Sequence, residues 1–186
     1  HYLDMPIQHS SDAILKRMGR KTSRQELEDI IGKLRREIPD TALRTTLITG
    51  FSGETEEDHE NLKSFVETMG FDRLGVFTYS PEEDTKAASL DNQVDEEVKL
   101  CRKDEIMELQ QEISMDKSER LVGKEIEVII EGKASDEDVY VGRSYMDAPS
   151  VDGYVFINSE EELMSGDFAK VRIVKAMEYD LIGDLI

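Results

Sequence analysis

The first part of the chain repeats a short apolar run followed by an amphipathic segment. The apolar runs at residues 2–7, 43–49 and 73–79 predict strands. Residues 23–37 and 56–69 carry apolar side chains at the spacing of a helix with one buried face. Strands that alternate with helices in this way predict parallel strands joined by crossover helices, and hence an α/β fold.

Local signals mark the ends of these helices. Ser23 or Thr22 is a candidate cap for the helix at residues 23–37, and Thr55 is a candidate cap for the helix at residues 56–69. Gly70 is placed to end the latter. In the helix predicted at residues 23–37, the apolar positions are Leu27, Ile30, Ile31 and Leu34.

The pattern changes in the second part of the chain. Residues 95–117 predict a long charged helix, whose apolar stripe is Val98, Ile106, Leu109 and Ile113. After Gly123, polar and apolar residues alternate, which predicts short strands in a small β-barrel. The expected strands are residues 126–130, 139–143, 153–157 and 168–176. We therefore expect two domains, residues 1–118 and residues 119–186.

The turn after the second apolar run is rich in glycine. It reads Gly50-Phe51-Ser52-Gly53-Glu54 and leads directly into the helix that begins near Thr55. Gly50 and Gly53 permit a positive φ or a close approach of the backbone. Two interpretations stay open: the glycines serve only the turn, or they line a site, because turns between strand and helix are where α/β proteins place sites.

Polar residues also follow the other two strands, at residues 8–11 (Gln-His-Ser-Ser) and 79–82 (Tyr-Ser-Pro-Glu). Carboxyl ends of parallel strands converge on one edge, so these residues are expected to meet the glycine turn. Gln8 and His9 have a simpler alternative role, which is to cap the next helix. The sequence Gly50–Gly53 is not a nucleophile elbow, because its second glycine comes one position early. No His or Cys spacing typical of a metal site occurs.

The chain is strongly acidic, with 42 acidic and 23 basic side chains and a formal net charge of −19. Such a charge disfavours a nucleic-acid backbone as partner, because phosphates are bound by Lys and Arg. It suits a basic partner, or it only keeps the surface solvated.

The composition also limits location and metal chemistry. No run of about 18 apolar residues is present, so we expect no membrane span. The first residues lack the basic segment of a signal peptide, and the single cysteine, Cys101, excludes an internal disulfide. We therefore expect a reducing, cytoplasmic location. A single cysteine also cannot hold an iron–sulfur cluster, which needs about three or four thiolates.

Several motifs resemble those of the radical S-adenosylmethionine (radical SAM) methylthiotransferases. Residues 6–11 look like a segment on the fourth strand of that family's barrel. Residues 47–55 are similar to the family's Ile-Val-Gly-Phe-Pro-Gly-Glu-Thr, and residues 77–85 resemble its Tyr-Ser-Pro-x-x-Gly-Thr turn. The tail from residue 121 looks like a TRAM domain. Residues 142–153 match the Gly-Arg-Ser-x-x-Asp-Ala-Pro-x-x-Asp-Gly pattern of the branch that modifies the small-subunit ribosomal protein S-12.

The resemblance implies a fold and an activity. The fold is the C-terminal half of a radical SAM partial TIM barrel with three βα units, followed by a small all-β, OB-like TRAM barrel. The activity is methylthiolation of an aspartate β-carbon in protein S-12. It implies S-adenosylmethionine and two 4Fe–4S clusters: one generates a radical that abstracts hydrogen, the second supplies sulfur, and another S-adenosylmethionine supplies the methyl group.

The resemblance also assigns residues by position. Residues implied to contact S-adenosylmethionine are Gln8, Ser10, Ile48, Gly50, Gly53 and Glu54. Residues implied to contact the substrate are Arg143, Asp147, Asp152 and Tyr154. Ser52 stands where the family has proline, which is expected to loosen the turn, and Asp84 stands where it has glycine, a conformation that other residues resist.

The family's Cys-x3-Cys-x2-Cys loop is not in this sequence. The chain is therefore expected to be a fragment, with no catalytic residue or metal ligand of its own, and to be inactive alone. Residues 119–186 carry 16 acidic and 7 basic side chains, which favours a basic protein over RNA as partner. Two alternatives stay open: a transfer-RNA methylthiotransferase of the same family, and a non-catalytic RNA- or ribosome-binding TRAM module.

Overall fold

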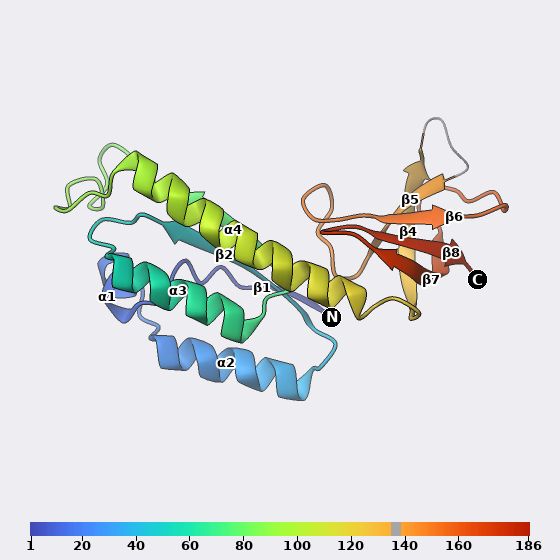
Figure 1. The fold of residues 1–186 in the computed structure, drawn as a ribbon, viewed down its shortest axis with the longest axis horizontal. Helices are drawn as coiled ribbons and strands as arrows, with labels where there is room; N and C mark the ends of the chain where they lie inside the picture. Colours follow the sequence, from blue (N-terminus) through green and yellow to red (C-terminus); the bar gives the residue numbers. More distant parts are fainter. Residues whose placement is uncertain (135–138) are drawn as a thin grey trace. The chain divides into compact units, whose positions relative to one another are not determined.

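The computed structural model describes residues 1–134 and 139–186, which divide into two compact units. One unit is Leu3–Gln110, and the other is Gln111–Ile186 with His1–Tyr2. The three-stranded sheet consists of β1 (Tyr2–Asp4), β2 (Ala42–Thr49) and β3 (Arg73–Thr78), in that order. β2 and β3 are parallel, with Leu47 opposite Val76, which confirms the predicted α/β arrangement (Figure 1).

The first strand is shorter than the apolar run predicted. β1 ends at Asp4. The N–H of Met5 still donates to the carbonyl of Arg44 (2.9 Å), and the next bridge to β2 is at Gln8, which forms an isolated parallel bridge to Leu47. Pro6 lies in the gap, and proline has no N–H to donate to a strand ladder. The bridge still brings Gln8 to the end of the sheet.

Four helices flank these strands: α1 (Asp12–Arg17), α2 (Arg24–Glu37), α3 (Glu56–Met69) and α4 (Glu96–Glu119). Ser23 caps α2 and Thr55 caps α3, each in a reciprocal capping box, and Gly70 ends α3 in the left-handed conformation. α2 and α3 lie side by side, as Figure 1 shows. The predicted limits of α3 are confirmed at both ends.

The inner faces of two helices differ from the predicted stripes. On α2, Leu27 and Ile31 are buried, but Ile30 is exposed. On α4 the expected stripe is wrong at Val98, which is 38% exposed. The buried positions of the first turns of α4 are Lys99, Arg102, Ile106 and Gln110. The hydropathy pattern did not predict this buried face because Lys99 and Arg102 are charged. They can be buried because they find partners at the strand ends.

The second unit contains a closed barrel with the strand order β4-β5-β6-β8-β7. Its strands are β4 (Glu125–Lys133), β5 (Val139–Ser144), β6 (Val155–Asn158), β7 (Phe168–Ala176) and β8 (Leu181–Leu185). The small β-barrel is confirmed, and β8 is a strand that the alternation did not reveal. Its interior is apolar and includes Val128, Ile130, Val155, Ile157 and Val171. In the described part of the chain, no helix has the length and apolarity needed to cross a bilayer.

Candidate functional site

The glycine turn lies at the carboxyl end of β2, and its backbone uses the conformational freedom that glycine permits. Gly50 has φ +70° and Gly53 has φ +81°, both in the left-handed region. A Cβ atom on Gly50 would lie 2.1 Å from Cγ of Lys99, so Gly50 is also a point of close approach. Both proposed uses of glycine, positive φ and close packing, therefore occur at Gly50.

The carboxylate of Glu54 closes this turn from inside. Its Oε2 accepts hydrogen bonds from the N–H groups of Gly50 (2.6 Å) and Phe51 (3.2 Å). Its Oε1 accepts from Arg102 at 3.1 Å, and the side chains of this ion pair are almost fully buried. The Glu54 carboxylate is thus committed to the turn and to α4.

This arrangement decides which ligands suit the turn. A glycine turn before a helix can bind phosphate through free N–H groups. Here Gly50 and Phe51 donate to Glu54, Gly53 donates to the carbonyl of Asn92 (2.8 Å), and a capping box occupies the first turn of α3. With those N–H groups already bonded and a carboxylate among them, the turn suits a neutral or cationic ligand rather than an anion.

The segment after β1 reaches the same edge of the sheet. Gln8 donates its N–H to Thr46 (3.0 Å) and accepts from Ile48 (2.8 Å), and it does so at φ +71°, which is unusual for a residue with a side chain. Ser10 is fully buried, and its hydroxyl has no hydrogen-bond partner among the described residues. Both lie on the predicted edge.

His9 shows that the capping interpretation also holds in part. Its Nδ1 accepts the N–H of Ser11 (2.9 Å), the residue that precedes α1. Its Nε2 is buried 3.7 Å from Oε2 of Glu54 and has no hydrogen-bond partner in the part of the chain that the structure describes. His9 therefore supports the start of α1 while its other nitrogen faces the glycine turn.

The segment after β3 adds an aromatic residue. Tyr79 packs edge-to-face on Phe51, with ring centroids 4.7 Å apart, and Ile48 packs against the same cluster. The Tyr79 hydroxyl is buried and has no partner among the described residues. Buried polar atoms normally find a partner, so the unpaired hydroxyls of Ser10 and Tyr79 are positions for a ligand or water to satisfy.

Two departures from the family motifs have clear structural outcomes. Asp84 has φ +63°, so it does adopt the conformation that glycine prefers. Ser52 does not loosen the turn. Its carbonyl and hydroxyl accept from Arg17 (2.8 and 3.1 Å), and its hydroxyl donates to the carbonyl of Asp91. Proline has no hydroxyl for these bonds, so serine holds the turn by different contacts.

Three cations at this site were not predicted: Arg17, Lys99 and Arg102. Lys99 donates to the carbonyl of Tyr79 (2.9 Å), while Arg102 holds Glu54. A signal was present in the sequence. Lys99, Arg102 and Ile106 are spaced so that they lie on one face of the helix. The buried face of Ile106 therefore continues through two charged residues.

On the barrel, the side chains assigned to substrate binding mostly hold their own loop. Asp147 is buried and accepts from the Ser144 hydroxyl (2.6 Å), and the Asp152 carboxylate accepts the N–H of Ala148 (2.8 Å). Arg143 donates to Glu131 (2.8 Å) and to the carbonyl of Asp147 (3.1 Å). The backbone N–H of Tyr154 donates to Asp180. The hydrogen bonds that hold this loop therefore account for the spacing of the residues in the motif.

A groove of about 570 Å³ lies elsewhere on the barrel. It is lined by Lys133, Tyr140, Ser159, Glu160, Glu161, Glu162 and Leu163. The three glutamates are exposed, and Lys133 lies over the ring of Tyr140. This face therefore presents consecutive carboxylates beside an aromatic side chain.

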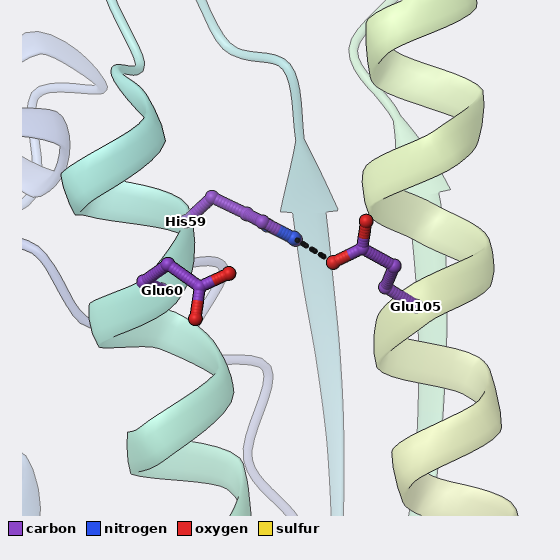
Figure 2. A group of neighbouring side chains, drawn as sticks. All are labelled: His59, Glu60 and Glu105. Carbon is purple, nitrogen blue, oxygen red and sulfur yellow. Dashed lines mark hydrogen bonds and ion pairs between the residues drawn. The ribbon is translucent and has the colours of Figure 1, made fainter.

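One polar cluster lies between α3 and α4 (Figure 2). The Nε2 atom of buried His59 lies 3.1 Å from Oε2 of Glu105, and Lys63 contacts both Glu60 and Glu105 at 2.9 Å. Ligand atoms of His59, Glu60 and Glu105 lie within 4.8 Å of one another. The Lys63 ammonium already supplies the cation, so the cluster joins two helices.

Glu105 predicts a loss of stability in acid. Hydrogen bonds from Lys63 and then His59 lower the pKa of Glu105 from 4.5 to about 2. Because the folded pKa is the lower one, its stabilisation is present above pH 4.5 and is lost as the pH falls toward about 2. The side chain is 38% exposed, so solvent screening reduces the effect to about 1 kcal/mol.

Urea unfolding of Glu105→Gln at pH 7 and pH 3 tests this expectation. The variant should lose about 1 kcal/mol at pH 7 and less than about half of that at pH 3. Glu108→Gln, an exposed position on the same helix, is the matched control and should leave the pH dependence unchanged. An equal loss at both pH values in Glu105→Gln would contradict the assignment.

Comparison with known proteins agrees with this architecture. Residues 1–66 match the radical SAM superfamily, and residues 122–186 match the TRAM domain family. The chain is 59% identical to the ribosomal protein uS12 methylthiotransferase RimO of Lachnoclostridium phytofermentans, over 98% of this chain and 42% of that protein. It is 50% identical to the protein of the same name from Clostridioides difficile, over 100% of this chain and 41% of that protein.

The fold and these matches point to the class of radical SAM proteins that carry a TRAM domain. Within that class the chain is a homologue of the RimO proteins, which confirms the family that the motifs indicated. It spans about two fifths of the length of these curated relatives.

Proposed function

We propose that this chain forms part of a methylthiotransferase that uses S-adenosylmethionine and acts on ribosomal protein uS12. This is the small-subunit protein that is written S-12 above. The observation that carries the proposal is the edge where three strands end. This edge brings together a glycine turn, which a buried carboxylate closes, and the hydroxyls of Ser10 and Tyr79, which have no hydrogen-bond partner within residues 1–134 and 139–186. The names of the relatives supply the reaction and its substrate.

The residues at this edge fit S-adenosylmethionine, which is cationic at sulfur and carries no phosphate. The ligand would meet Gly50 and Gly53 through the backbone, Ile48 through apolar contact, and Ser10 and Gln8 through polar groups. Glu54 would act indirectly, by shaping the turn. Bound there, S-adenosylmethionine supplies the radical and methyl-transfer chemistry of this superfamily.

The residues present do not fit an iron–sulfur cluster. Cys101 is the chain's one cysteine, and a hydrogen bond to Glu105 raises its pKa, which favours the thiol over the thiolate that ligates iron. Ligands for the two 4Fe–4S clusters would come from parts of a longer protein. We infer that residues 1–118 and 119–186 are two domains of that protein, and that this chain has no methylthiotransferase activity by itself.

The acidic barrel supports a protein substrate. Residues 119–186 carry a net charge of −9, and exposed carboxylates gather at Glu160, Glu161 and Glu162 beside the groove. RNA recognition relies on basic surfaces with aromatic platforms. The charge favours a Lys- and Arg-rich ribosomal protein over the transfer RNA of the alternative hypothesis.

Binding measurements with purified uS12 and with transfer RNA test this proposal. We expect uS12 to bind, with an affinity that falls about tenfold or more between 50 and 300 mM salt. Charge reversal belongs at Glu160, Glu161 and Glu162, because Asp147 and Asp152 hold their loop. The triple Lys variant should weaken uS12 binding at least about fivefold.

The matched control for this triple variant changes the net charge equally at three exposed residues of the other unit, Glu82, Glu83 and Glu97. It should bind uS12 nearly as well as the unmodified chain. Tight binding of transfer RNA at physiological salt, together with no binding of uS12, would contradict the proposal and favour a transfer-RNA enzyme or an RNA-binding module.

A further inference from the structure

The start of α4 carries two cations that are almost completely buried. Lys99 is 5% exposed and Arg102 is 6% exposed, and both reach the carboxyl ends of the strands. A buried cation is costly unless its partners are close, so each must be held by specific contacts. Those contacts are with the residues that shape the candidate cofactor site.

Arg102 acts on the end of β2. Its Nη1 donates to both the carbonyl and Oε1 of Glu54 at 3.1 Å, and its Nη2 donates to Glu56 at 3.2 Å. Oε2 of Glu54, the oxygen that Arg102 does not contact, accepts the N–H groups of Gly50 and Phe51. The position of these two amides therefore depends on Arg102 through one carboxylate.

Lys99 joins the ends of β2 and β3. Its stem fills the space beside Gly50, and its carbonyl accepts from the hydroxyl of Thr49 at 3.3 Å. Its ammonium donates to the carbonyl of Tyr79 at 2.9 Å and to Glu96 at 3.1 Å, and it lies 5.6 Å from the centre of the Tyr79 ring. One side chain thus fixes the distance between the two strand ends.

We propose that Arg102 and Lys99 are positioning residues for S-adenosylmethionine; this inference rests on the proposed function. The peptide between Gly50 and Phe51 is planar, so its carbonyl points away from Glu54 when its N–H points toward it. In the proposed complex, that carbonyl accepts a hydrogen bond from an N–H or O–H donor of S-adenosylmethionine. Without Arg102, the Glu54 carboxylate would be buried without its cationic partner and would turn away from the peptide. The peptide would then lose its fixed orientation.

The test uses the 186-residue chain, labelled with ¹⁵N, and S-adenosylmethionine itself as the probe. In the unmodified chain we expect added S-adenosylmethionine to shift the amide resonances of Gly50 and Phe51. Arg102→Gln should raise the Kd for S-adenosylmethionine at least about fivefold. Arg102→Lys keeps the charge and should recover part of that loss. Lys103→Gln, which removes the neighbouring cation on α4, should leave the Kd unchanged.

Amide exchange without ligand separates a positioning role from a general loss of stability. In Arg102→Gln, exchange at Gly50 and Phe51 should rise about tenfold, while exchange at Leu47 and Leu62 in the core stays within about twofold. A uniform rise across the unit would assign Arg102 a structural role only and would overturn the inference.

The outcomes separate this inference from the proposed function. Absence of any shift in the unmodified chain would overturn the proposed cofactor site, and the positioning role with it. Equal Kd values for the unmodified chain and Arg102→Gln would overturn the inference alone. If circular dichroism shows that Arg102→Gln does not fold, Arg102→Lys carries the comparison: a raised Kd supports the inference, and an unchanged Kd overturns it.

Discussion

Replacing Glu54 by alanine is expected to lower the free energy of unfolding by about 3–5 kcal/mol. The substitution leaves the guanidinium of Arg102 buried without its main partner, and removing one member of a buried ion pair costs this much because the other charge stays uncompensated. The N–H groups of Gly50 and Phe51 lose their acceptor at the same time. Urea unfolding followed by circular dichroism measures the loss.

Glu56 provides the matched control, because it contacts the same guanidinium. The Glu56 side chain is 74% exposed, whereas that of Glu54 is fully buried. Glu56→Ala should therefore cost less than about 1 kcal/mol, as exposed ion pairs do. Glu54→Gln should fall between the two, because an amide oxygen still accepts the turn N–H groups. If Glu54→Ala and Glu56→Ala cost the same, the buried network does not stabilise the turn.

The sequence predicted most reliably those features that depend on neighbouring residues. The helix at residues 56–69 has the predicted bounds because Thr55 and Asp58 form a capping box and Gly70 takes the left-handed conformation. The positive φ of Gly50 followed from its place between a buried strand and a helix. Interactions within one turn of backbone can be read from residues a few positions apart.

Features that depend on distant segments were harder to predict. Arg102 is 48 residues away from Glu54, and only the folded chain brings them together. The hydropathy pattern therefore assigned α4 an apolar stripe that its buried cations do not follow. β8 was missed because Gly183 and Asp184 interrupt its alternation, although Leu181 and Gly183 are buried on the inner face of the barrel.

The same contrast between neighbouring and distant residues applies to the residues assigned to the site. Glycine positions and strand ends could be located from sequence, so Gln8, Ser10, Ile48 and Gly50 all lie on the strand edge that parallel pairing predicts. The roles of acidic side chains could not be read in this way. A carboxylate that caps its own loop has the same sequence signature as one that awaits a ligand. Asp147, by its contact with Ser144, is an example.

Gly50→Ala should be among the most destabilising single changes in the chain, with a loss of about 2–4 kcal/mol. Alanine at φ +70° costs about 1 kcal/mol. The new methyl group would also lie 2.1 Å from Cγ and 2.9 Å from Cβ of Lys99. These atoms belong to the inner part of a buried side chain, so Lys99 must shift and give up its bond to the Tyr79 carbonyl. Thermal and urea unfolding measure the loss.

The variant Gly19→Ala separates the cost of the backbone conformation from the cost of the clash with Lys99. Gly19 has nearly the same backbone angle as Gly50, φ +76°, but a Cβ atom there would meet no atom of the described residues within 4 Å. Gly19→Ala should therefore cost only the conformational part, about 1 kcal/mol. The difference between the two variants measures the packing of α4 on the glycine turn. If it is close to zero, Lys99 adapts freely, and the turn is not held by α4 in the way that the Lys99 contacts imply.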